Sequence, residues 1–201
     1  MSSDAVSWFS LSAWILGLGA CSVVVQTPAK QADPRGDART ENLPMTIQLQ
    51  SPAFTHNAII PKKFSEDGED LSPELQWSHL PSGVKELALI CDDPDAPAPE
   101  PWVHWVIFKI PATATGLSEN VAKVEKPAAP AGALQGKNSW GKIGYGGPAP
   151  PQGHGVHHYH FRLYALDAAL TLPPGADKKT LLGAMKGHTL ATGELIGTYQ
   201  R

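Results

Sequence analysis

Side chains that can bind anions or move protons lie within or shortly after two stretches rich in proline and glycine. Asp93 lies in the first stretch, CDDPDAP, and His104 comes shortly after it. His157 and Tyr159 come directly after the second stretch, GGPAPPQGHGV. Imidazole and phenol groups are donors that suit the oxygen atoms of a phosphate or an acetate. Brought together, these side chains would bind an oxyanion.

Asp93 is compatible with a bound anion once protons are counted. A phosphate monoester has a second pKa near ~6, so its monoanion can donate an O–H to the carboxylate. A phosphodiester lacks this proton, and a diester that carries an ammonium group would place the ammonium against Asp93 instead. The carboxylate would also raise the pKa of a neighbouring histidine and fix its tautomer.

Metal and nucleotide chemistry fit these stretches less well. Three nearby carboxylates lack the glycine and the spacing of an EF-hand calcium loop. The histidine cluster has no third ligand at a recognised spacing, so we expect neither a zinc nor a copper site. The glycines precede no helix and no Lys-Ser/Thr pair, which argues against a P-loop. The carboxylates and histidines of these two stretches are Asp92, Asp93, Asp95, His154, His157, His158 and His160.

Strand periodicity places two of the histidines at the ends of buried rows. In residues 156–166 alternate side chains share a face, so His157 and Tyr159 begin an apolar row and His158 points the other way. In residues 103–110 the same alternation puts His104 on one face together with Trp102, Val106, Phe108 and Ile110.

The rest of the chain predicts a β-rich fold, mainly antiparallel, with a few short helices. With 19 glycines and 19 prolines in 201 residues, a helical bundle is excluded. Further strands are expected at residues 46–49, 86–91 and 189–199. One helix is expected at residues 177–187, with Asp177 as its N-cap and with Leu181, Leu182 and Met185 on one face. The net charge of -3 argues against nucleic acid as a partner.

The two stretches resemble motifs of the phosphatidylethanolamine-binding protein family, in its bacterial Raf-kinase-inhibitor-like branch. Further similar segments are SPAF, DGEDLSPEL, IPATATGL, GALQGKNSWG and LIGTYQR, so that the resemblance covers residues 45–201. It implies an anion pocket made by Asp93, His104, His157 and Tyr159. It also places Trp102, Pro97, Gly147, Pro150 and Pro151 around the mouth, and the peptide bond between Ala96 and Pro97 is a candidate for the cis form.

This chain departs from the family pattern at two places. The arginine of the family's H-R-Y element is His158 here, which by alternation points away from the pocket. Many bacterial relatives carry cysteines where this chain has Glu66 and Ala149, so a disulfide that those cysteines could form is absent here. Cys91 lies in an apolar run and is expected to be a small buried hydrophobe.

The N-terminus has the pattern of an export signal. Residues 6–20 are apolar and too short to span a bilayer comfortably. They end in LGAC, which resembles a bacterial lipobox with Cys21 as the acylated residue. We therefore expect a signal peptide at residues 1–20, a flexible tether at 21–44 and the folded domain at 45–201. The alternatives are a plain secretory signal, or a cytoplasmic protein whose translation starts at Met45.

We expect a non-enzymatic binding protein on the periplasmic side of a bacterial membrane, anchored by its lipid. The ligand would be a phosphate-containing or other anionic small molecule. Since relatives include inhibitors of kinases and of a serine carboxypeptidase, the resemblance also implies a protein target, which the sequence does not name. The alternative is a hydrolase of a phosphate or acyl ester with His104 or His157 as base, although no G-x-S-x-G motif is present.

Overall fold

The computed structural model describes residues 45–201. Seven strands form the main sheet, in the order β1-β10-β9-β5-β6-β8, and β3 also pairs with β10. The pairs are antiparallel except that β1 and β3 each run parallel to β10. These strands are β1 (Met45–Thr46), β3 (Ala58–Ile59), β5 (Glu86–Asp93), β6 (Trp102–Pro111), β8 (Leu134–Gln135), β9 (His157–Leu166) and β10 (Thr189–Tyr199).

A small antiparallel sheet lies on one face of the main sheet. It consists of β2 (Gln48–Gln50), β4 (Leu75–Ser78) and β7 (Gly116–Leu117). A single 3-10 turn, η1 (Lys62–Phe64), and one helix, α1 (Lys178–Met185), complete the regular structure of the described residues. The predicted β-rich and mainly antiparallel fold is confirmed.

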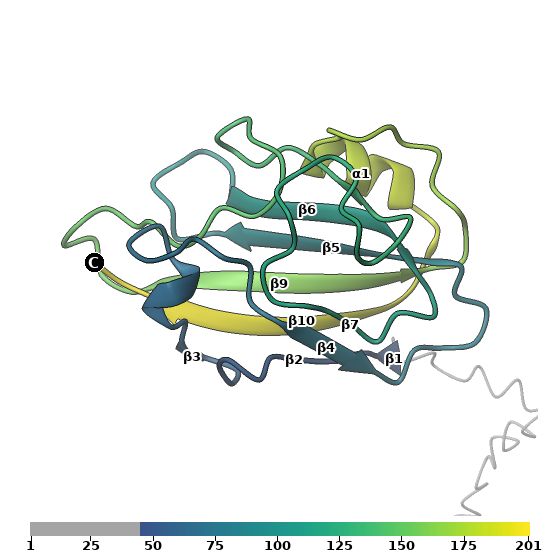
Figure 1. Cartoon of the computed structure of the whole chain (residues 1–201), viewed down its shortest axis with the longest axis horizontal. Coiled ribbons are helices and arrows are strands. Elements are labelled where there is room, and N and C mark those ends of the chain that lie inside the picture. The colour runs from purple at the N-terminus through teal and green to yellow at the C-terminus, as the bar shows by residue number, and fades with distance from the viewer. Residues whose placement is uncertain (1–44) are drawn as a thin grey trace, which may run out of the picture. The chain divides into compact units, whose positions relative to one another are not determined.

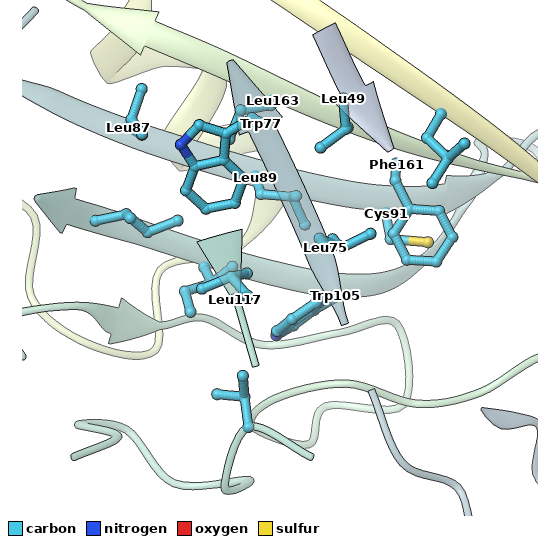
Figure 2. Packing of buried hydrophobic residues seen from close by; sticks show 14 of the residues in the cluster. Leu49, Leu75, Trp77, Leu87, Leu89, Cys91, Trp105, Leu117, Phe161 and Leu163 are labelled. Carbon is cyan, nitrogen blue, oxygen red and sulfur yellow. The ribbon is translucent and has the colours of Figure 1, made fainter. Parts of the chain in front are cut away.

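The main core lies between the two sheets. Figure 2 shows Leu75 and Trp77 of β4 packed with Leu89, Phe161 and other buried side chains of the main sheet. Side chains of this kind become buried because removing apolar surface from water contributes about 25 cal/mol per Å². The core holds the strand ends in fixed relative positions, which matters for the polar residues at those ends.

A second core lies under α1, on the other face of the main sheet. Asp177 caps the helix, as predicted, since its side chain accepts a hydrogen bond from the backbone N–H of Thr180. Leu181 and Met185 are buried against Ile90 and its neighbours. Leu182 remains 38% exposed, so its predicted place on the buried face was wrong. It lies one residue after Leu181, and a helix turns by about 100° per residue.

Two of the predicted strands differ in detail. The expected strand at 46–49 is split at Ile47, which is buried and lies where the chain leaves the main sheet for the small one. In β6 the predicted alternation fails. The register with β5 shifts twice, and Lys109 has a φ of 55° in the left-handed region. His104 therefore faces Tyr159, whereas Val106 and Phe108 pack under α1.

The cis peptide bond of the described residues is at Ala129–Pro130, so the prediction of a cis bond at Ala96–Pro97 is wrong. The predicted signal peptide and tether, including Cys21, lie outside the described residues.

Different parts of the chain lie at the two ends of the β9–β10 pair. His157 at the start of β9 pairs with Tyr199 at the end of β10, whereas β1 pairs with Ala191 and Thr192 near the beginning of β10. Figure 1 shows β1 and the C-terminus at opposite ends of the long strands. The chain therefore enters the domain far from the polar end of β9.

Candidate functional site

A cavity of about 260 Å³ opens at the polar ends of β5, β6 and β9. Of the predicted pocket and mouth residues, all but Gly147 line it. These are Asp93, His104, His157, Tyr159, Trp102, Pro97, Pro150 and Pro151. The volume suits a headgroup or a small anion rather than a drug-sized ligand, which needs about 300–1,000 Å³.

Asp93 is buried at the end of β5 and organises two other residues. Its Oδ2 atom accepts a hydrogen bond from His157 Nδ1 at 2.7 Å, and its Oδ1 atom accepts one from the backbone N–H of Asp95 at 2.8 Å. Because a carboxylate only accepts, the Nδ1 atom of His157 carries the hydrogen. His157 is itself only 1% exposed. The contact joins residues 64 positions apart in the sequence.

His104 is fixed by the second proline-rich stretch. Its Nδ1–H donates to the carbonyl oxygen of Gly146 at 2.7 Å. Its ring meets Tyr159 and Trp140 edge-to-face, with centroids 4.9 and 5.1 Å apart. Burial lowers the pKa of His104, since the charged imidazolium would lose its hydration. In the neutral ring the Nε2 atom then presents a lone pair and not a hydrogen.

Tyr159 carries an unsatisfied polar group. It is 1% exposed, and its hydroxyl is the one buried side-chain oxygen or nitrogen within residues 45–201 that has no hydrogen-bond partner. Burial, with a smaller contribution from Asp93, raises the pKa of Tyr159 well above its ordinary value. The phenol therefore keeps its hydrogen and can donate it.

The three carboxylates of the first proline-rich stretch bond to four different basic side chains. Asp92 is buried and bonds to Arg162 at 2.7 Å and to Lys178. Asp93 bonds to His157, and Asp95 bonds to the exposed His158 at 2.7 Å. Within the described residues, no three histidine, cysteine or acidic side chains are grouped as metal ligands.

Gly147 lies beside the cavity without lining it. Its backbone N–H donates to Asp70 Oδ1 at 2.7 Å. A Cβ atom at this position would lie 2.4 Å from the carbonyl oxygen of Phe64, at the end of η1. The missing side chain thus permits close packing between two loops, and Gly147 is not among the residues that line the cavity.

Several wall residues lie outside the set that the sequence predicted. Trp140 packs edge-to-face on Trp102, and Arg201 brings a permanent cation that bonds to Asp67 through two atoms at 2.9 Å. Glu66 and Ala149 also line the wall. The sequence marked these last two only as positions where relatives carry cysteines. Trp140 and Arg201 lie in the segments GALQGKNSWG and LIGTYQR, which resemble the family, but their residue types alone indicated no role in the site.

His154 lies next to the cavity residues, although its sequence pattern suggested a role only as a metal ligand. Its Nδ1 atom lies 2.8 Å from His157 Nε2, and the two rings are 5.0 Å apart. Both nitrogens of His157 are therefore engaged by protein groups.

The domain is β-rich and has a small cavity at the ends of its strands. The family model described as phosphatidylethanolamine-binding protein matches residues 50–200. This chain belongs to that family, as its motifs predicted.

Relatives extend the similarity over nearly the whole domain. A UPF0098 protein of Methanothermobacter thermautotrophicus is 51% identical over 155 residues, which is 77% of this chain and 99% of that protein. The crystal structure of Escherichia coli YbcL, described as a member of the mammalian family, gives a TM-score of 0.73 at 30% identity, covering 77% of this chain and 98% of YbcL.

One relative bears on the N-terminus. The Mycobacterium tuberculosis protein named "Putative lipoprotein LppC" is 38% identical over 181 residues, which is 90% of this chain and 80% of that protein. Within residues 45–201 the structure has no helix long and apolar enough to cross a membrane.

Proposed function

We propose that this protein binds an oxyanion, such as a phosphate group, in the cavity at the ends of β5, β6 and β9. The bound group undergoes no chemical reaction there. The observation that carries the proposal is the hydroxyl of Tyr159, which is buried in the cavity wall and has no partner within the described residues. Leaving a buried donor unsatisfied costs about 1–3 kcal/mol. A ligand oxygen at this point would recover that cost.

The remaining groups complement a phosphate that carries a hydrogen. Tyr159 and Arg201 are donors, whereas Asp93 and the neutral His104 Nε2 are acceptors. A monoester or inorganic phosphate has both anionic oxygens and an O–H, so it can meet both kinds of group. Trp102 and Pro97 would contact whatever the phosphate is attached to, on a small molecule or on a partner protein.

Binding is favoured over hydrolysis by the composition of the cavity wall. Among the described residues that line the cavity, none is a serine, threonine or cysteine that a histidine could activate as a nucleophile. The buried Cys91 thiol has its pKa raised by burial, the opposite of what an activated thiolate needs.

We further propose that the domain is exported and anchored through Cys21. The proposal rests on the lipobox-like LGAC and on a relative that is named a lipoprotein.

Calorimetric titration of the full chain with inorganic phosphate tests the binding proposal. Affinity should be weak, in the millimolar range, because a small anion makes few bonds and loses its hydration. Tyr159→Phe should weaken binding about tenfold or more, the effect of one hydrogen bond to a charged group. It should not destabilise the free protein and should raise its free energy of unfolding, since it removes a buried hydroxyl that has no partner within the described residues.

Tyr164→Phe is the matched control, because Tyr164 lies on the same strand and packs on the α1 side. His158→Ala, which removes an exposed imidazole on the opposite face, is a second control. Equal weakening in Tyr159→Phe and Tyr164→Phe, or no phosphate binding to the wild type at millimolar concentration, would argue against the proposed site.

A further inference from the structure

Three side chains form a hydrogen-bonded row at the edge of the cavity. Asp93 Oδ2 bonds to His157 Nδ1 at 2.7 Å, and His157 Nε2 bonds to His154 Nδ1 at 2.8 Å. Asp93 and His157 are buried cavity residues, whereas His154 is exposed and does not line the cavity. An exposed residue thus occupies the one nitrogen of His157 that a ligand could use.

When the His157 ring is neutral, the direction of the second hydrogen bond follows from the first. Because Asp93 accepts from Nδ1, a neutral His157 has only a lone pair at Nε2. His154 must then donate its Nδ1–H to that lone pair. A ligand group that takes the place of His154 at the Nε2 atom of His157 must also donate a hydrogen. The O–H of a phosphate can do this, whereas a phosphodiester has no O–H to donate.

The backbone around His154 allows it to leave. Gly153 and Gly155 have φ values of 73° and 88°, a conformation that favours glycine, and an added Cβ at either would meet no atom within 4 Å. The loop surface around them is exposed, and two long backbone hydrogen bonds hold it: the N–H of His154 donates to the carbonyl of Pro151 at 3.2 Å, and the N–H of Gly153 donates to the carbonyl of Arg201 at 3.3 Å. Few contacts therefore oppose a rotation that takes His154 off His157.

We propose that His154 is a specificity-determining residue that competes with the ligand for the Nε2 atom of His157. The inference rests on the proposed oxyanion binding. An anion that reaches His157 must displace His154, so the affinity measured is reduced by the cost of breaking this contact. Anions with an O–H replace the lost hydrogen bond, whereas anions without one leave the Nε2 lone pair unsatisfied. The cavity therefore selects monoesters and free phosphate over diesters.

Titration of the full chain with inorganic phosphate, at fixed pH and with a chelator present, tests this competition. His154→Ala should bind phosphate about 2- to 10-fold more tightly than the wild type, the range expected for one net hydrogen bond. Because His154 is exposed, the variant should fold normally. The matched control is His188→Ala, since His188 is also exposed and also makes a side-chain hydrogen bond through Nδ1, in its case to the carboxylate of Asp167 at 2.9 Å. It lies at the other end of β9 and β10.

The outcomes separate this inference from the proposed function. If the wild type binds phosphate and His154→Ala binds equally or more weakly, the competition is contradicted and the proposed function stands. If neither protein binds phosphate, both are contradicted. A titration of His154→Ala with dimethyl phosphate, which has no O–H, should show weaker binding than with phosphate. Equal affinity for the two would contradict the requirement for a donated hydrogen.

Discussion

His104 shows how burial sets the chemistry of a single residue in this cavity. Its pKa is lowered because the ring is almost completely removed from water. This effect outweighs the negative charge of Asp93, which by itself would raise the pKa. Between its lowered folded pKa and the unfolded value near ~6.5, the unfolded chain binds more protons than the folded one. The folded state should therefore lose stability as the pH falls below about 6.5, by at most about 1.4 kcal/mol per pH unit from this group.

His104→Phe should remove this contribution. The free energy of unfolding, measured by denaturant titration from pH 7 to pH 5, should decrease less steeply in His104→Phe than in the wild type. The comparison uses the slope alone, because the substitution also removes the bond to Gly146 and lowers stability at every pH. Parallel slopes would contradict a neutral His104.

The sequence was informative for site residues that belong to strands and less so for residues in loops. Alternation along β9 correctly placed His157 and Tyr159 on the buried face and His158 on the exposed one. The partners of these residues could not be predicted in the same way. Arg201 and Trp140 reach the wall from segments far away in sequence, and the bond from His154 to His157 depends on how a glycine-rich turn is folded.

At the scale of elements, local irregularities explain where periodicity failed. The two register shifts against β5 and the left-handed Lys109 turn β6 side chains from one face to the other. They bring His104 to the cavity while Val106 stays under α1. The alternation rule assumes an uninterrupted strand, and no residue type in β6 indicates that a bulge is present. The order of the strands in the main sheet could not be predicted from the sequence either, since β1 and β3 pair in parallel with the last strand of the chain.

α1 offers a sharp test of how the second core is built. Leu181→Ala should lower the free energy of unfolding by about 2–5 kcal/mol, because the side chain is fully buried and leaves a cavity. Leu182→Ala, next to it on the exposed side, should change it by less than about 1 kcal/mol. Chemical denaturation of both variants measures the difference. Similar losses in the two would place the helix in a different rotation about its axis.

At the scale of the whole domain, the first described strand and the cavity lie near opposite ends of β10. The chain enters at β1, which pairs with β10 at Thr192, and the cavity lies near Tyr199. The seven residue steps from Thr192 to Tyr199 span roughly 24 Å at about 3.4 Å per step. The start of the folded domain and its cavity are thus separated by most of the length of β10.

The anchor itself can be tested on the full chain expressed in a bacterium that processes lipoproteins. Wild-type protein should partition into detergent and carry acyl chains on Cys21, and Cys21→Ala should abolish both. Mass spectrometry of the mature N-terminus measures the outcome. A mature protein that begins at Met45, or one cleaved elsewhere without added lipid, would contradict the anchor.

The most direct test of the central claim is a crystal structure of the protein grown with phosphate. We expect an oxyanion in the cavity, within hydrogen-bonding distance of the Tyr159 hydroxyl and of His104 Nε2, with His154 turned away from His157. Phosphate found only at surface lysines, with water alone beside Tyr159 and with His154 still bonded to His157, would contradict the proposed binding site.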